Sequence, residues 1–172
     1  AASRASFGGR LQVISVGSAP SSPELLAFLE RCFSDLWVTD GYGSTEVGTI
    51  TANGLVQGHV AVKLVPVPGV PVGEVERGEI WVRSPHLIDG YYGDPEASAA
   101  ALDGEGFFRT GDLGERTAEG RVRVVGRVKN IVKLGQGEFV AVDRVEAELA
   151  TCPVVDQIFV HPDAASSALQ AV

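Results

Sequence analysis

Residues 41–46 (GYGSTE) combine residue types suited to binding a nucleotide. The glycines let the backbone approach a planar ligand closely, and Tyr42 offers an aromatic face on which a base can stack. Ser44 and Thr45 supply hydroxyls and amides for a phosphate, and the Glu46 carboxylate is a ligand type that Mg²⁺ accepts. A glycine turn capped by Ser44 and Thr45 would account for the hexapeptide equally well. No GxxxxGK[ST] run occurs, so this is not a Walker A loop.

Two further segments carry polar groups that suit a nucleotide. Residues 107–113 (FFRTGDL) place Asp112 in a predicted tight turn after a strand, where its carboxylate is able to accept both hydroxyls of a ribose. Residues 126–133 (GRVKNIVK) bring Arg127, Lys129 and Lys133 together in an otherwise acidic protein. Taken singly, these segments are better explained as an Asx-type turn and as a solvated basic strand edge.

Short strands and helices would position these segments. The apolar run at residues 11–16 predicts a buried strand that ends in the turn at residues 17–20. A helix then follows, with Ser22 as its N-cap and Pro23 in its first turn. The other predicted strands cover residues 36–38, 60–67, 79–83, 121–125, 131–134, 154–160 and 168–172, and the other predicted helices cover residues 94–102 and 142–150. The pattern predicts a mixed α+β fold: residues 1–127 form a larger, β-rich part, and residues 128–172 begin a second α+β part.

Composition excludes several classes of function. Of the 172 residues, 45% are hydrophobic and 21% are charged, which is typical of a globular chain and not of a disordered one. The net charge of −8 makes nucleic acid and anionic membrane surfaces poor partners, but a small nucleotide held by backbone amides and one or two cations remains compatible with it. No apolar run has the length of a membrane span.

Cysteine and histidine give no support for a zinc site. Cys32 and Cys152 are far apart in the sequence and are expected to be buried free thiols in a reducing cytoplasm. The three histidines are equally scattered. The N-terminus lacks the apolar stretch of a signal peptide, and the chain contains no Met. We therefore expect a cytoplasmic location and a chain cut from a longer protein.

In this order and spacing, the segments resemble motifs of the adenylate-forming superfamily, which includes acyl-CoA synthetases, luciferases and nonribosomal adenylation domains. The matching segments are residues 17–20 (GSAP), 41–46 (GYGSTE), 78–92 (GEIWVRSPHLIDGYY), 94–96 (DPE), 109–113 (RTGDL) and 126–133 (GRVKNIVK). Residues 133–140 (KLGQGEFV) and 157–161 (QIFVH) look closest to carboxylic acid reductases and long-chain acyl-CoA ligases. Loading domains of polyketide or nonribosomal assembly lines are also compatible with these features.

The resemblance implies a fold and an activity. Residues 1–127 would be the C-terminal part of the large adenylation subdomain, including a barrel-like portion, and residues 128–172 would be the hinge and the start of the small C-terminal subdomain. Such enzymes join a small carboxylic acid or fatty acid to ATP with the help of Mg²⁺, forming an acyl-adenylate and pyrophosphate. A thiol of coenzyme A, or of phosphopantetheine on an acyl carrier protein domain, then displaces AMP.

The resemblance also implies roles for single residues. Thr45 would bind the α-phosphate, Glu46 would hold Mg²⁺, and Lys133 would face the thioester-forming step. Lys129 falls at the hinge position, and Gly43, Val47 and Gly48 would border the acyl pocket. The residues expected to bind ATP or AMP are Ser18, Ala19, Asp40, Gly41, Tyr42 (stacked on the base), Thr45, Asp112 (on the ribose hydroxyls) and Arg127.

The family's upstream phosphate loop and its downstream catalytic lysine have no counterpart in these residues, which amount to about a third of a family-length protein. We therefore expect the 172-residue chain alone to bind nucleotide weakly and to catalyse adenylation negligibly. The alternative is a catalytically incomplete nucleotide-binding or scaffolding remnant, against which the intact Thr45, Glu46, Asp112 and Arg127 argue. A self-contained oxidoreductase is disfavoured because no G-x-G-x-x-G fingerprint follows a strand.

Overall fold

The structure is a computed structural model, and it describes residues 6–19, 21–70, 74–135, 138–163 and 168–172. The strands are β1 (Val13–Gly17), β2 (Trp37–Ser44), β3 (Gly48–Ala52), β4 (Leu55–Val56), β5 (Ala61–Val65), β6 (Arg77–Arg83), β7 (Phe108–Arg116), β8 (Val122–Arg127), β9 (Ile131–Lys133), β10 (Phe139–Ala141), β11 (Val160–Asp163) and β12 (Ala168–Ala171). The helices are α2 (Pro23–Cys32), α3 (Pro95–Ala101), α4 (Val142–Leu149) and the short 3₁₀ helix η1 (Val128–Asn130).

The first sheet has the strand order β1-β2-β3-β4 and begins with a parallel pair, β1 and β2, connected by α2. Ser22 caps α2 as predicted, because its hydroxyl accepts a hydrogen bond from the Leu25 amide at 3.2 Å. The strand predicted at residues 36–38 is much longer in the structure. β2 continues to Ser44, so most of the glycine-rich segment is extended and only its last residues form a turn.

The second sheet is antiparallel, with the order β5-β6-β7-β8. The period-two pattern predicted at residues 79–83 is confirmed, since Ile80 and Val82 are fully buried and their neighbours are partly exposed. The expected barrel-like portion is wrong. A barrel requires hydrogen bonding between the first and last strands, whereas β5 and β8 are the two edges of an open sheet in the part of the chain that the structure describes.

The hydrophobic core joins the turn and strand after β2 to the second sheet. Its buried members are Val47, Ile50, Val60, Leu64, Ile80, Val82, Phe108 and Val122. Val47 and Ile50 come from the β2–β3 connection and β3, and the others come from the second sheet and the residue before it. This packing fixes the turn that contains Thr45 and Glu46 against the sheet that contains Asp112.

After β8 the chain forms η1, the antiparallel pair β9–β10, α4 and the antiparallel pair β11–β12. The strand at residues 131–134, the helix at 142–150 and the strand at 168–172 are confirmed to within one or two residues. The strand predicted at residues 154–160 is wrong over most of its length, because β11 begins only at Val160. Val154 and Phe159 are exposed, so their apolar character does not reflect burial in a sheet of the described residues.

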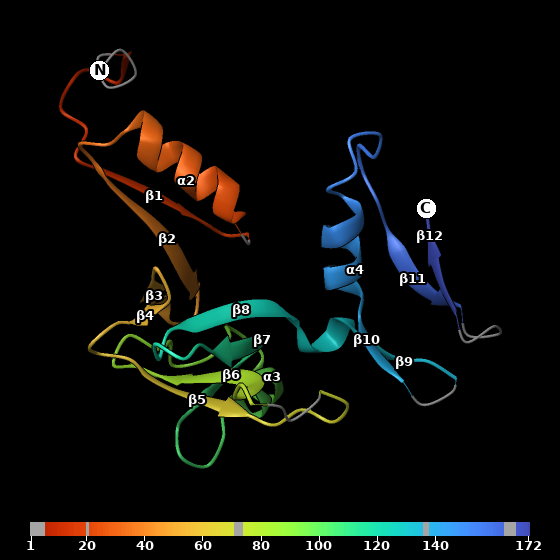
Figure 1. The fold of residues 1–172 in the computed structure, drawn as a ribbon. Helices are drawn as coiled ribbons and strands as arrows, with labels where there is room; N and C mark the ends of the chain where they lie inside the picture. The colour runs from red at the N-terminus through yellow and green to blue at the C-terminus, as the bar shows by residue number, and fades with distance from the viewer. Residues whose placement is uncertain (1–5, 20, 71–73, 136–137, 164–167) are drawn as a thin grey trace.

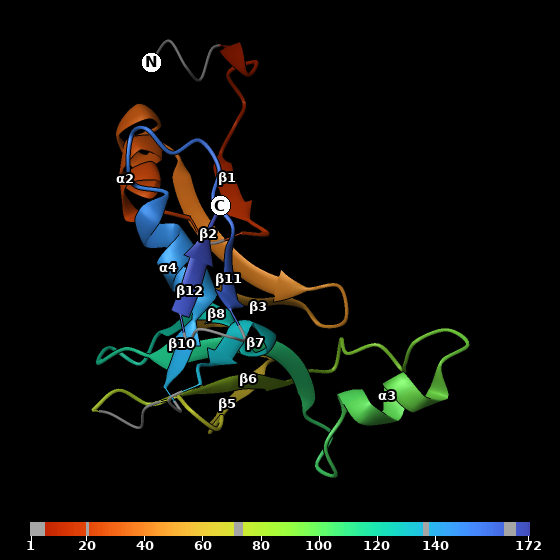
Figure 2. The ribbon, with the colours of Figure 1, turned by 90° about the vertical axis from the view of Figure 1, so that its right-hand side faces the viewer.

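Figure 1 shows β1, α2 and β2 on one side and α4 with β11 and β12 on the other, both above the β5–β8 sheet. In Figure 2, α3 projects beyond the end of that sheet. None of the helices in the described ranges is long and apolar enough to cross a membrane.

Both cysteines are free as predicted, but the prediction that they are buried is wrong: Cys152 is exposed and Cys32 is half-buried.

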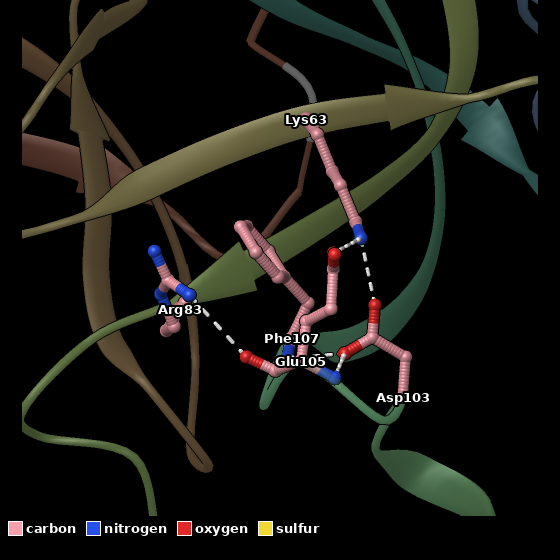
Figure 3. Close-up of polar contacts among 5 residues, drawn as sticks. All are labelled: Lys63, Arg83, Asp103, Glu105 and Phe107. Carbon is pink, nitrogen blue, oxygen red and sulfur yellow. Dashed lines mark hydrogen bonds and ion pairs between the residues drawn. The ribbon is translucent and has the colours of Figure 1, made fainter.

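Lys63 of β5 connects the segment after α3 to the sheet (Figure 3). Its Nζ donates hydrogen bonds to Asp103 Oδ2 at 2.7 Å and to Glu105 Oε2 at 3.0 Å. The same ammonium lies 4.1 Å from the centroid of the Phe107 ring, and the Arg83 guanidinium lies 4.7 Å from it. The Lys63 hydrogen bond lowers the pKa of Asp103 to about 2.

Replacing Asp103 by Asn is expected to reduce, severalfold, the hydrogen-exchange protection of residues 103–107 at pH 7. Asp103 Oδ1 accepts hydrogen bonds from the amides of Glu105 at 2.9 Å and Phe107 at 2.8 Å, and a neutral amide accepts them less strongly and leaves Lys63 without its closest carboxylate. Since folding lowers the Asp103 pKa from 3.8 to about 2, its contribution is complete above about pH 4 and is lost as the pH falls toward 2. Exchange measured by mass spectrometry and corrected for intrinsic rates should show the two proteins converging over this interval. An equal difference at pH 2 and pH 7 would contradict the assignment.

Candidate nucleotide-binding site

Asp112 is the centre of a contact between three strands. Its Oδ2 accepts a hydrogen bond from the Tyr42 hydroxyl of β2 at 2.7 Å, and its Oδ1 pairs with Arg127 Nε at the end of β8 at 2.9 Å. The Asp112 residue is 7% exposed, whereas the Arg127 side chain is 54% exposed. Three residues predicted to bind the same nucleotide, and separated by up to 85 positions in the sequence, therefore meet at one point that is open on the Arg127 side.

The prediction that Asp112 lies in a tight turn after a strand is wrong, because it lies within β7, in a bulge. Three residues of β7, at positions 110–112, stand opposite the single residue Ile80 of β6. Gly111 has a φ of 71°, which glycine adopts without strain. The Thr110 hydroxyl donates to the Ile80 carbonyl at 2.7 Å and accepts from the Asp112 amide at 3.1 Å. The bulge thereby turns Asp112 toward Tyr42.

Asp112 has acceptor positions that its two partners do not use. Burial raises the pKa of Tyr42, and the Asp112 carboxylate raises it further, so the phenol stays protonated and acts as a donor. An ionised carboxylate has about four acceptor positions, of which Tyr42 and Arg127 occupy two. The remaining capacity matches the two hydroxyls of a ribose.

Glu46 lies in the turn between β2 and β3, next to the exposed Thr45. Its Oε1 accepts a hydrogen bond from the Tyr91 hydroxyl at 3.0 Å, and its carbonyl accepts one from the Ile88 amide at 2.9 Å. Burial acts to raise the pKa of Glu46, but hydrogen bonds, including that of Tyr91, and the positive charge of Arg127 outweigh it and lower the pKa. Glu46 is therefore ionised at neutral pH and lies within electrostatic reach of Arg127.

Residues 17–19 follow a strand that pairs with the strand of Tyr42. Gly17 at the end of β1 pairs with Gly41 of the parallel strand β2, and a Cβ at Gly17 would come within 2.6 Å of the Gly41 carbonyl oxygen. Ser18 follows with a φ of 72°, and Ser18 and Ala19 are both exposed. Asp40 is half-buried, and its Oδ1 accepts a hydrogen bond from the Ser21 hydroxyl at 3.3 Å. The structure thus brings residues 17–19 next to the strand of Gly41 and Tyr42, while Pro20, the last residue of the GSAP segment, lies outside the described residues.

The remaining predicted residues lie in η1, β9 and the β2–β3 region. Lys129, in η1, is exposed, and so is Lys133, whose Nζ lies 5.6 Å from the Phe139 ring centroid. Gly43 and Gly48 are exposed neighbours across the β2–β3 pair, but Val47 belongs to the hydrophobic core. Bordering an acyl pocket therefore stays a prediction for these three residues, as do the hinge role of Lys129 and the thioester role of Lys133.

Three residues of this region had no predicted role. Thr110 shapes the Asp112 bulge, and Tyr91 contacts Glu46. Asp143 of α4 accepts hydrogen bonds from the Arg127 amide at 3.1 Å and from Asn130 Nδ2 at 2.6 Å, one on each side of Lys129. The hydrogen-bonded pairs of Tyr91 and Asp143 are 13 to 45 residues apart in the sequence, so a local sequence pattern does not predict them.

A Mg²⁺ ion fits Glu46 only if a nucleotide supplies other ligands. The described residues contain no group of three or more His, Cys, Asp and Glu side chains placed to hold a metal. Mg²⁺ is commonly held by one or two carboxylates together with substrate phosphates and water. The single ionised Glu46 carboxylate matches that donor set and does not match an all-protein site.

A separate cavity of about 320 Å³ lies between the second sheet and the C-terminal part. Its lining includes Leu113, Val125, Phe139 and Val145. None of the predicted nucleotide-binding residues lines this cavity, so the Asp112 contacts form a different region of the surface.

Comparison with known proteins agrees with the expected resemblance. The family described as AMP-binding enzyme matches residues 1–92. Long chain acyl-CoA synthetase 7, peroxisomal, of Arabidopsis thaliana is 38% identical over 181 residues, which cover 96% of this chain and 26% of the relative. Carboxylic acid reductase of Segniliparus rugosus is 40% identical over 172 residues, which cover 96% of this chain and 14% of the reductase.

Solved structures give the same result. The adenylation domain of the carboxylate reductase of Mycobacterium chelonae aligns with a TM-score of 0.83 and 40% identity, covering 98% of this chain and 27% of that domain. The corresponding domain from Segniliparus rugosus, solved with AMP and a co-purified carboxylic acid, aligns with a TM-score of 0.81 and 40% identity, covering 96% of this chain and 27% of that one. The chain thus spans about a quarter of these domains and of the plant synthetase. Its sequence, its fold and the match over more than half of its residues show that the chain belongs to the AMP-binding enzyme family, also known as the adenylate-forming superfamily.

Proposed function

We propose that the protein containing this chain activates a carboxylic acid with ATP to give an acyl-adenylate and pyrophosphate, and then transfers the acyl group to a thiol. The observation that carries the proposal is the meeting of Tyr42, Asp112 and Arg127, with Glu46 in electrostatic reach of the arginine. Similarity to a reductase domain solved with AMP and a carboxylic acid supports the substrate classes.

Each residue has a physical task in this reaction. Asp112 accepts the ribose hydroxyls and so fixes the position of the α-phosphate relative to the acid. Tyr42 lies beside the base, and the hydroxyl of Thr45 in the exposed turn donates a hydrogen bond to the α-phosphate. Arg127, which is ion-paired and partly exposed, reduces the repulsion between the carboxylate nucleophile and the phosphate. A Mg²⁺ ion shared between Glu46 and the phosphates would supply further charge neutralisation.

The acceptor thiol belongs to coenzyme A or to a carrier-protein phosphopantetheine. Both alternatives have support, because the chain is similar to acyl-CoA synthetases and to a reductase solved as an adenylation–carrier-protein didomain. In this proposal, residues 1–127 belong to the large subdomain, and residues 128–172 form the hinge at Lys129 and the start of the small subdomain.

The test is acid-dependent exchange of radiolabelled pyrophosphate into ATP by the full-length protein, with a panel of aliphatic and aromatic acids. We expect robust exchange from the wild type and a loss on the order of 100-fold for Glu46→Gln, because the neutral amide binds Mg²⁺ beside the phosphates more weakly than the carboxylate does. Glu30→Gln, which neutralises an exposed glutamate of α2, is the matched control and should retain full exchange. Absence of acid-dependent exchange in the wild type would instead favour a binding or scaffolding role.

A further inference from the structure

A segment that follows β6 holds Glu46 at two points. The Tyr91 hydroxyl donates to Glu46 Oε1 at 3.0 Å, and the Ile88 amide donates to the Glu46 carbonyl at 2.9 Å. The first contact fixes the direction of the carboxylate, and the second fixes the backbone from which it projects. The structure gives no such contact to Tyr92, the next residue, which is fully exposed.

The backbone of Tyr91 is itself fixed by the first turn of α3. The Tyr91 amide donates to Ser98 Oγ at 2.8 Å, and the same hydroxyl donates to the Asp94 carbonyl at 2.6 Å. The Asp94 amide donates to the Tyr91 carbonyl at 3.2 Å, and Asp94 Oδ1 caps α3 through the Ala97 amide at 2.9 Å. These hydrogen bonds join the backbone of Tyr91 to the N-terminus of α3. The position from which its side chain reaches Glu46 is therefore fixed.

We propose that Tyr91 is a positioning residue that orients the Glu46 carboxylate toward the divalent cation of the bound nucleotide. The proposal rests on the proposed function, because it takes Glu46 as the ligand of that cation. The Tyr91 hydroxyl uses one of the about four acceptor positions of the ionised Glu46 carboxylate. A carboxylate held in this way loses less rotational freedom when the cation binds, and outer hydrogen-bond partners of metal ligands typically change metal affinity by about 10- to 100-fold.

The experiment compares Tyr91→Phe with Tyr92→Phe in the full-length protein. Each variant removes one hydroxyl from adjacent tyrosines, but only the first removes a bond to Glu46. Phenylalanine keeps the ring and the backbone bonds of residue 91, so folding is expected to be retained. Binding of Mn²⁺, used in place of Mg²⁺, is measured from the free-Mn²⁺ signal in electron paramagnetic resonance, with a non-hydrolysable ATP analogue present.

We expect Tyr91→Phe to raise the Mn²⁺ dissociation constant by about tenfold and Tyr92→Phe to leave it unchanged. In the exchange assay, Tyr91→Phe should raise the Mg²⁺ concentration required for half-maximal rate, while the half-saturating ATP concentration at excess Mg²⁺ stays constant. A purely structural role would lower protein stability without this metal-specific change. Ser98→Ala, which removes the hydroxyl that accepts a hydrogen bond from the Tyr91 amide, should shift the metal affinity in the same direction.

The failures of the two proposals are distinguishable. Equal Mn²⁺ affinities for Tyr91→Phe and Tyr92→Phe, in a wild-type protein that does catalyse acid-dependent exchange, would overturn the role of Tyr91 and leave the proposed function standing. A wild-type protein that neither catalyses exchange nor binds Mn²⁺ with the analogue would overturn the proposed function and the role of Tyr91 with it.

Discussion

Replacement of Asp112 by Ala is expected to weaken ATP and AMP binding by the full-length protein on the order of 100-fold, or about 3 kcal/mol. The variant removes the acceptor for both ribose hydroxyls. It also leaves the Tyr42 hydroxyl and the Arg127 guanidinium without the carboxylate they share. Asn is expected to restore little, because donors face both oxygens of Asp112 and one of them would meet the Asn NH₂ group.

Ribose analogues make this prediction specific. The wild-type protein should bind ATP much more tightly than 2′,3′-dideoxy-ATP in calorimetry, and Asp112→Ala should bind the two with similar, weak affinity. Asp156→Ala, which removes an exposed aspartate from the C-terminal part, is the matched control and should retain the preference. If Asp112→Ala still distinguished the two nucleotides, the ribose assignment would be contradicted.

The parts of the fold that were predictable depend on local signals. Ser22 and Asp94 cap helices because their side chains reach amides three residues later, and that interaction requires no other part of the chain. The alternation around Ile80 and Val82 likewise reports burial of one sheet face. Residues 154–160 were misassigned because an apolar segment can remain exposed at a turn, as Val154 does.

The bulge at Asp112 was not predictable, because it depends on strand pairing. The TGD sequence is compatible with an Asx-type turn, and only pairing with β6 shows that these residues continue a strand. The Gly111 amide, turned out of the ladder, donates to Glu79 Oε1 at 3.1 Å, a partner 32 residues earlier. A pattern within a short window of sequence cannot predict such a distant partner.

The sequence predicted which residues belong to the candidate site better than it predicted the contacts between them. The order of the segments was enough to expect Tyr42, Asp112 and Arg127 at one nucleotide, and the structure brings them together. The expectation for Tyr42 concerned its ring, whereas the structure shows that its hydroxyl also orients Asp112. The part played by Tyr91 escaped notice because a tyrosine beside a helix cap fits simple surface packing equally well.

Gly43 and Gly41 lie two residues apart on β2, and the structure predicts opposite outcomes for the same substitution. A Cβ at Gly43 would overlap the carbonyl oxygen of Gly48 and lie 3.1 Å from Thr49 Cα, and both atoms are backbone of the paired strand β3. No side-chain rotation relieves such an overlap, so β2 and β3 must separate next to the turn that contains Glu46. A Cβ at Gly41 would have its nearest neighbours at 3.6 Å, which is an ordinary contact distance.

We expect Gly43→Ala to destabilise the β2–β3 pair by about 3 kcal/mol, the upper end of the usual cost of an added methyl group in a packed site. Hydrogen exchange by mass spectrometry on the full-length protein should then show protection of residues 43–52 reduced on the order of 100-fold, with Gly41→Ala close to the wild type. Because Glu46 and Thr45 lie in the connecting turn, Gly43→Ala should also lose nucleotide-dependent protection of this segment. Equal protection in the two variants would mean that β2 and β3 can separate at Gly43 without cost. The conclusion that a rigid β2–β3 turn positions Glu46 would then be wrong.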